Sequence, residues 1–373
     1  MRQVNNENLI NLAAGVPAAS LLPVEDLSKC YRRVVKVSDG ACYAYELPEG
    51  DPGLRTELAQ RLENRNVTLP QKEGDVLLTI GCTQALRLAL ELTVKPGDLV
   101  ACESPCYYNL LEQIESLGAK ALPIPTDIND GVTPEALEPL LNRYGPKSLV
   151  VCSSLSNPTG ATIPLENRSR LVELCRKYDV NLIEDDIYAE LRDEGALPPL
   201  RSFDDGSQVL YVSSYCKSVA PGLRVGVFLP GPFWEEAAQK RCMEIMHGST
   251  LAEGILREYL KSKLIDKHLE EMKKICYRRR SIVRNAVEAY FPKNTLVSNP
   301  QGGFLLWAVL PTWICLEEAA QASLSKGVSF ARGEVFLTGK PKQACMRLNC
   351  AKASEDELAK GIEILGKILK QRS

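Results

Sequence analysis

Histidine is scarce in this chain, and long hydrophobic runs are absent. Among the 373 residues there are two histidines, His247 and His268, which disfavours a histidine-rich metal centre and a histidine-based catalytic triad. The longest apolar runs, such as Gly303–Leu310, are much shorter than the roughly 20 residues that a membrane helix needs. The first residues, Met1–Asn8, lack the apolar segment of a signal peptide. We therefore expect a cytoplasmic protein with no metal centre and no membrane partner.

Cysteine is plentiful, but its spacing excludes the usual uses of many cysteines. Thirteen of them are scattered along the chain with no Cys-x-x-Cys pair, so zinc ribbons and redox dithiol motifs are not indicated. Several, including Cys102, Cys152 and Cys345, lie in apolar runs typical of strands, where buried free thiols are expected. The formal net charge of −2 favours neither a nucleic-acid partner nor an anionic membrane. The chain is long enough for two domains.

The central part of the sequence alternates between short apolar runs and amphipathic stretches. This alternation, from about residue 75 to 230, is typical of an α/β domain. Because the runs are apolar throughout, they predict a large, mainly parallel sheet of seven strands with helices on both faces. The strand candidates are Val76–Ile80, Leu99–Glu103, Ala119–Ile124, Ser148–Ser153, Val180–Glu184, Val209–Ser213 and Arg224–Leu229.

The pattern changes after residue 232. A long helical region, Phe233–Phe291, is followed by three further strand candidates and the amphipathic stretch Ser354–Lys370, which together predict a smaller α+β domain. The three strands are Gly303–Leu310, Gly327–Ala331 and Cys345–Asn349. We expect residues 1–45 to form an N-terminal arm that joins the small domain, residues 46–245 the large domain, and residues 246–373 the small C-terminal domain.

Chemically distinctive residues follow several of the strands, at the edge where open α/β sheets bind ligands. Gly81-Cys82-Thr83 opens a helix after the first strand, and the free N–H groups of a helix N-terminus suit a phosphate. Tyr107 follows the second strand and can stack on a flat heterocycle, although a tyrosine there is more often part of a core. Asn157 lies in a tight turn that directs its side chain into the cleft.

Two charged residues at strand ends carry the strongest signal. Asp185 ends a buried strand, where a carboxylate is costly unless a cation such as a protonated pyridine nitrogen faces it. The alternative for Asp185 is a helix N-cap. Lys217 lies just past another buried strand, seven residues before Arg224. Desolvation and a nearby cation lower the pKa of a lysine, which makes it a nucleophile toward an aldehyde. Arg224 and Ser214 can bind a phosphate.

Taken together, these motifs resemble the fold-type I enzymes that use pyridoxal 5′-phosphate (PLP), the class I/II aminotransferases. The chain is similar to the 2-aminoadipate/kynurenine aminotransferase branch and to the aminotransferase-like domain of certain bacterial transcription regulators. In fold and core motifs it also resembles PLP-dependent cyclases that act on hydroxyarginine. The resemblance extends from Ile10–Pro17 to the C-terminal helix, and it is carried by Asn157-Pro-Thr-Gly160, Asp185-Asp-Ile-Tyr188, Ser214-Tyr-Cys-Lys217 and Pro221-Gly-Leu-Arg224.

The resemblance implies a role for each matching residue around the cofactor. Lys217 would hold PLP as a Schiff base and later carry the α-proton as acid and base. Asp185 would pair with the pyridinium nitrogen, and Asn157 and Tyr188 would hydrogen-bond the phenolic oxygen. Tyr107 would stack on the ring. The phosphate would be held by Gly81, Cys82, Thr83, Ser214 and Arg224.

The resemblance also implies a substrate clamp and a second subunit. Arg347, near Gly15 and with Asn157, would hold the α-carboxylate of the substrate, while a buried structural arginine is the alternative. Tyr45 resembles the tyrosine that reaches the phosphate of the neighbouring subunit, which implies a homodimer. One departure from the relatives is Cys216, where they often carry serine. A second is the bulky Tyr108 beside the stacking tyrosine.

The expected reaction is transfer of an amino group from an L-amino acid to a 2-oxo acid, with the cofactor cycling between two forms. The same groups also serve elimination or cyclisation of a hydroxylated amino acid such as a hydroxyarginine, and the identity of the product distinguishes the two. A domain that senses a ligand through PLP without turnover is a third hypothesis. It needs a basic DNA-binding segment, which neither the length nor the charge of the chain indicates.

Overall fold

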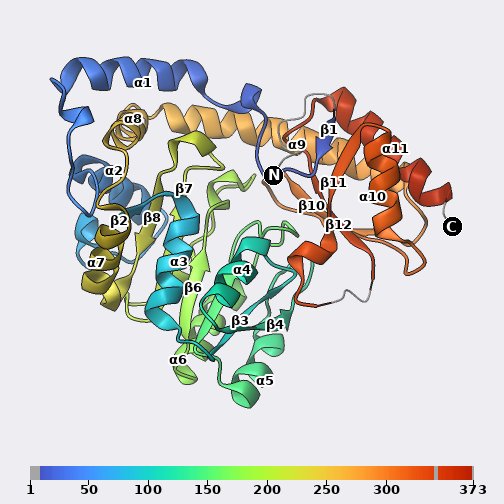
Figure 1. Cartoon of the computed structure of the whole chain (residues 1–373), viewed down its shortest axis with the longest axis horizontal. Coiled ribbons are helices and arrows are strands. Elements are labelled where there is room, and N and C mark those ends of the chain that lie inside the picture. The colour runs from blue at the N-terminus through green and yellow to red at the C-terminus, as the bar shows by residue number, and fades with distance from the viewer. Residues whose placement is uncertain (1–8, 340–342, 372–373) are drawn as a thin grey trace.

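The computed structural model describes residues 9–339 and 343–371. The stretch Met1–Asn8, on which the expectation about a signal peptide rests, lies outside them. Within the described residues the chain forms one sheet of seven strands and one of five, each with helices packed around it (Figure 1). In this part of the chain no helix has both the length and the apolar character to cross a bilayer.

All seven predicted strands form the larger sheet, with ends that differ from the prediction by a residue or two. Its strand order is β2-β8-β7-β6-β5-β3-β4. The pairs β2–β8 and β7–β8 are antiparallel and the others are parallel, so the α/β class is confirmed. The strands are β2 (Leu77–Thr79), β3 (Leu99–Ser104), β4 (Lys120–Pro125), β5 (Ser148–Cys152), β6 (Asn181–Asp185), β7 (Val209–Ser214) and β8 (Gly226–Leu229).

Helices cover both faces of this sheet because its strands are apolar on both sides. Val150 of β5 packs in the cluster with α3 (Gly81–Thr93), α4 (Tyr108–Ser116) and α7 (Trp234–Ile245). Its neighbour Val151 points to the opposite face and packs with α5 (Pro134–Tyr144) and α6 (Leu165–Lys177). The carboxyl ends of the parallel strands therefore meet at one edge between the two helical layers.

The smaller sheet combines the first described residues with the C-terminal part of the chain. Its strand order is β1-β11-β12-β10-β9, and β1 pairs in parallel with β11, Ile10 opposite Val328. Its strands are β1 (Ile10–Leu12), β9 (Leu296–Val297), β10 (Leu305–Val309), β11 (Val328–Arg332) and β12 (Cys345–Asn349), and the helices α10 (Leu316–Ser325) and α11 (Glu355–Gln371) accompany them. The expected domain boundaries at 45/46 and 245/246 stay a prediction.

The expected single helical region Phe233–Phe291 is divided. It contains α7, α8 (Thr250–Lys261) and α9 (Leu264–Tyr290), because Met246 and Lys263 have positive φ, which ends a helix. Ser249 then caps α8, its Oγ accepting from the backbone N–H of Ala252 at 3.3 Å. Near the N-terminus, α1 (Val24–Val37) lies along α8 at one side of the molecule, and α2 (Pro52–Glu63) follows it (Figure 1).

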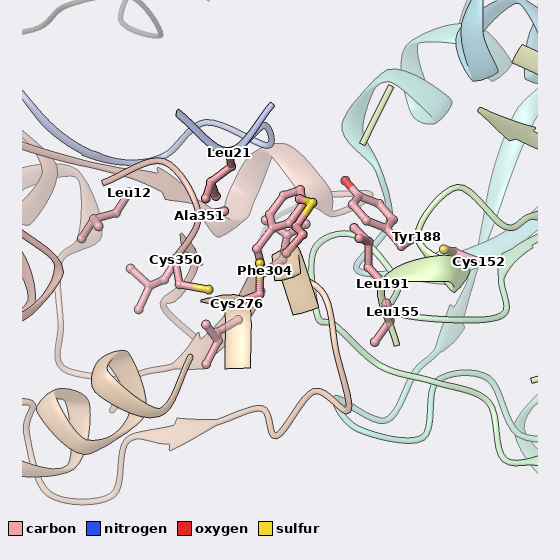
Figure 2. Close-up of a cluster of buried hydrophobic side chains, with 14 of the residues drawn as sticks. Leu12, Leu21, Cys152, Leu155, Tyr188, Leu191, Cys276, Phe304, Cys350 and Ala351 are labelled. Atoms are coloured by element: carbon pink, nitrogen blue, oxygen red, sulfur yellow. The ribbon is translucent and has the colours of Figure 1, made fainter. Parts of the chain in front are cut away.

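A continuous apolar core joins the two sheets. Figure 2 shows Leu12 of β1, Cys350 just after β12, Cys276 of α9 and Tyr188 after β6 contributing to one cluster with Phe304. The rings of Tyr188 and Phe304 meet edge to face with centroids 5.7 Å apart. Most of the thirteen cysteines are buried free thiols, as expected, whereas Cys315 is exposed.

Candidate active site

A cavity of about 820 Å³, counted out to its mouth, opens at the carboxyl edge of the seven-stranded sheet. Residues that are far apart in the sequence line it together because α3 and the segments after β3, β5, β6 and β7 all begin at this edge. The predicted site residues in its wall are Cys82, Thr83, Tyr107, Asn157, Asp185, Tyr188, Lys217 and Arg224.

Asp185 holds one carboxylate oxygen fixed and leaves the other without a donor. Its Oδ1 accepts from the backbone N–H of Ile187 at 3.2 Å and from the Sγ–H of Cys82 at 3.4 Å. No group in the described residues donates to Oδ2. Burial raises the pKa of Asp185 to about 6, against the effect of these two bonds and of Lys217. A ring N–H⁺ in the cavity would find an unoccupied acceptor here.

Lys217 lies in the same buried wall. Its Nζ donates to the backbone carbonyl of Gly15 at 2.7 Å, so the segment after β1 contacts the predicted nucleophile. Burial lowers the pKa of Lys217, and the charge of Arg347 lowers it further, while Asp185 opposes this. A lowered pKa enlarges the share of neutral amine, which is the form that attacks a carbonyl carbon.

The N-terminus of α3 forms an electropositive end of the cavity. Gly81 has φ +70°, and a Cβ there would lie 2.7 Å from Nη2 of Arg224, so only glycine permits this approach. Arg224 donates from Nη2 to the carbonyl of Ile80 at 3.0 Å and lies 3.4 Å from the Sγ of Cys216 through Nη1. No side chain caps the helix, and its free N–H groups beside the guanidinium suit a phosphate dianion.

Arg347 connects β12 to the mouth of the site without lining the cavity itself. Its Nη1 donates to Oδ1 of Asn157 at 2.7 Å and its Nη2 to the carbonyl of Ala13 at 2.6 Å. Its Nε is buried without an acceptor. The guanidinium packs 4.8 Å above the ring of Phe336 and against Gly15. Two of its five N–H donors are used, so three remain for a ligand.

Two tyrosines complete the wall. The hydroxyl of Tyr188 is buried and has no hydrogen-bond partner, which is unfavourable unless a ligand supplies one. The ring of Tyr107 stands 5.0 Å from that of Tyr108, edge to face. Burial raises the pKa of both Tyr107 and Tyr188, so both stay protonated donors.

Ser214 and Tyr45, like Gly15, Gly81 and Arg347, do not line this cavity. Ser214 is buried, and its Oγ accepts from the backbone N–H of Cys216 at 3.0 Å. It lines a smaller neighbouring cavity. Tyr45 is 81% exposed, and its ring meets that of His247 edge-on at 5.2 Å. The roles assigned to both residues stay predictions.

Sequence reasoning missed Glu103, which also lines the cavity. Its Oε2 accepts from the backbone N–H of Cys152 and the Oγ–H of Ser156, each at 3.0 Å, and its Oε1 is buried without a donor. Burial raises the pKa of this carboxyl to about 8. The signal was present, because a carboxylate ends the otherwise apolar run Leu99–Glu103 and needs an explanation.

The arrangement fits PLP in four ways. A half-buried amine can react with an aldehyde, a carboxylate oxygen lacks a donor, a tyrosine hydroxyl lacks a partner, and an uncapped helix N-terminus with Arg224 lies at one end. Among residues 9–339 and 343–371, no cluster of three histidine, cysteine or acidic side chains has the geometry of a metal site.

Comparisons with known proteins agree with this chemistry. The family model described as "Aminotransferase class I and II" matches residues 7–365. The uncharacterized HTH-type transcriptional regulator YdcR of Escherichia coli (strain K12) is 30% identical over 98% of this chain and 78% of its own. Aromatic-amino-acid aminotransferase 1 of Thermococcus litoralis is 28% identical over 100% of this chain and 90% of its own.

Comparison with solved structures also points to the aminotransferases. LysN, the alpha-aminoadipate aminotransferase of Thermus thermophilus complexed with N-(5′-phosphopyridoxyl)-L-leucine, superposes with a TM-score of 0.91 at 27% identity, covering 98% of this chain and 93% of that one. The expectations about fold and cofactor are therefore confirmed. With a family model that spans nearly all of it and a cavity suited to PLP, the chain belongs to the class I and II aminotransferases and is a PLP-dependent enzyme of that family.

Proposed function

We propose that this enzyme moves the amino group of an L-amino acid to a 2-oxo acid, with Lys217 as the residue that bonds the cofactor and moves the α-proton. The observation that carries the proposal is the placement of the Lys217 amine and the Asp185 carboxylate in the wall of one buried cavity. Bound PLP supplies an electron sink for the charge left on the substrate α-carbon.

Asp185 serves that sink by holding a proton on the ring nitrogen. Its Oδ1 is occupied by Ile187 and Cys82, so Oδ2 would accept the N–H of the cofactor ring. The cation facing it would make the ionised form favourable despite burial. The hydroxyl of Tyr188 and the amide of Asn157 would donate to the phenolic oxygen, which would give the buried hydroxyl the partner it lacks.

Lys217 moves the proton. Burial lowers the pKa of Lys217, which enlarges the share of neutral amine at Nζ. With PLP bound, Nζ would take the proton from the substrate α-carbon and later give it up, acting first as general base and then as general acid. The carbonyl of Gly15, 2.7 Å from Nζ, keeps the amine oriented.

Arg347 and the first turn of α3 bind the two anionic groups, the α-carboxylate of the substrate and the phosphate of the cofactor. The remaining N–H donors of Arg347 bind the substrate α-carboxylate, and Gly15 leaves room for it beside the guanidinium. The N–H groups of Cys82 and Thr83 bind the phosphate together with Arg224.

The proposal includes a homodimer in the cytoplasm. Tyr45 and several large apolar side chains are exposed in the single chain, and a second copy would cover them. Val37 is 74% exposed and Met243 is 73% exposed. The hydroxyl of Tyr45 would then donate to the phosphate held by the partner.

The test is the identity of the product. The purified enzyme is incubated with aminoadipate, aromatic, branched and arginine-derived amino acids, each with and without 2-oxoglutarate, and the products are identified by mass spectrometry. We expect a 2-oxo acid and, in the half-reaction without 2-oxoglutarate, accumulation of pyridoxamine phosphate. An altered amino acid without pyridoxamine phosphate would show elimination or cyclisation, for example of a hydroxyarginine, instead of amino-group transfer.

A further inference from the structure

Cys82 contributes to both ends of the cavity. Its backbone lies in the first turn of α3, at the phosphate end of the cavity. Its side chain is buried and extends to the ring-nitrogen end, where Sγ lies 3.4 Å from Oδ1 of Asp185. The two residues are 103 positions apart in the sequence, so this contact exists only because α3 packs beside the end of β6.

The thiol in this position is a donor. Burial raises the pKa of Cys82 well above its usual value, and the nearby Asp185 carboxylate raises it further. Cys82 therefore carries its proton at neutral pH, and an S–H group beside a carboxylate donates a weak hydrogen bond. Asp185 has one other donor in the described residues, the N–H of Ile187, and it binds the same oxygen.

We propose that Cys82 is a positioning residue for Asp185, whose S–H fixes Oδ1 and leaves Oδ2 directed at the cofactor ring nitrogen. The inference rests on the proposed role of Asp185. Two donors on one oxygen prevent the carboxylate from turning about its Cβ–Cγ bond and exchanging its oxygens. Donation also stabilises the ionised form, so the shared proton stays on the ring nitrogen.

Asp185 has several titratable neighbours besides Cys82. The charge of Asp186 raises the pKa of Asp185 and that of Lys217 lowers it. Asp185 in turn raises the pKa of its neighbours Glu103, Tyr107, Cys152 and Tyr188. These groups are the same in the parent and in a Cys82 variant. A difference between the two proteins therefore reports the thiol.

The first experiment measures the PLP dissociation constant of the cofactor-free protein across pH. The variants are Cys82→Ala and Cys82→Ser, and the control is Cys106→Ala, which removes another buried thiol from the same cavity wall. PLP affinity should rise with pH as Asp185 ionises. Loss of the donor raises the pKa of Asp185, so in Cys82→Ala the midpoint of this rise should move to higher pH. We expect binding about fivefold weaker near neutral pH, the value of one modest hydrogen bond.

Two further outcomes make the result decisive. Serine also donates a hydrogen bond, so Cys82→Ser should return the midpoint toward that of the parent, whereas Cys106→Ala should leave it in place. An unshifted midpoint in Cys82→Ala, no rescue by serine, or an equal shift in the control would overturn the inference.

The second experiment observes the bond itself in the cofactor-free protein. An infrared difference spectrum between the parent and Cys82→Ala isolates one S–H stretching band among the thirteen thiols. We expect this band at lower frequency than that of a free thiol, and Asp185→Asn should move it. A band that is indifferent to Asp185→Asn would show that the thiol donates elsewhere.

Asp185→Asn also separates this inference from the proposed function. If PLP affinity is lost in Asp185→Asn but unchanged in Cys82→Ala, the inference about Cys82 fails and the role of Asp185 survives. If Asp185→Asn binds PLP like the parent, the proposed role of Asp185 fails.

Discussion

The two ends of the cofactor cavity differ in how much of each end a single chain supplies. At the proposed ring-nitrogen end, Cys82 and Tyr188 are buried and Asp185 is half-buried, and the acid is held by donors from α3 and from its own loop. At the proposed phosphate end, Ile80 is 37% exposed, and Tyr45, which the proposal assigns to the phosphate of the partner, lies outside the cavity. Stabilising the charge that develops during the reaction needs a dry, fixed environment. A phosphate, in contrast, can be held at a surface that another subunit covers.

This difference predicts that changes at the inner end abolish chemistry and that changes at the outer end weaken anchoring. Lys217→Ala should have the largest effect. Without the amine there is no group to move the α-proton, and turnover should fall by about 10³-fold or more. PLP should still bind through the phosphate end. Steady-state assays with Lys240→Ala as control test this, and turnover above a tenth of the parent value would refute it.

Arg347→Met comes second, since it acts on the substrate and leaves both cofactor ends intact. Removal of a bidentate charged contact should raise the KM for the amino acid by about 100-fold. Arg332→Met, on the neighbouring strand β11, is the matched control, for which we expect less than a twofold change. If Arg347→Met alters PLP affinity but not KM, the arginine is structural.

Tyr45→Phe tests the outer end. Loss of a hydroxyl bond to a phosphate should weaken PLP binding by about tenfold, and the deficit should be restored by excess PLP. Tyr43→Phe changes a similarly exposed neighbour and is the control. Sedimentation should show a dimer in all three proteins, and a monomer with unaltered PLP affinity would contradict a shared site.

Glu103→Gln should have the smallest effect, on stability rather than on turnover. Burial raises its folded-state pKa to about 8, above the unfolded value of about 4.3. The folded state therefore binds the proton more tightly, and stability is lost as pH rises through this window. Glu103→Gln has no titrating carboxyl at this position, so its stability should not fall over this pH window. Urea unfolding at two pH values on either side of about 7 should show that the free energy of unfolding falls by about 1 kcal/mol more in the parent than in the variant. Equal losses in the two proteins would contradict the prediction.

The pattern of the sequence was sufficient for the large sheet but not for the contacts inside the cavity. Seven apolar runs predict seven strands because a strand buried on both faces has a local signature. The Cys82–Asp185 contact has none, since it depends on how α3 packs against β6. The division of Phe233–Phe291 was missed because Met246 and Lys263 adopt positive φ without the glycine or asparagine that marks such a position.

The measurement that tests the account most directly is borohydride reduction of the purified enzyme with PLP, followed by peptide mapping. Reduction makes the bond between amine and cofactor permanent, and the account predicts the reduced cofactor on Nζ of Lys217 in a protein that also loses its activity. A protein that takes up no PLP, or that carries the adduct on another lysine, would contradict it.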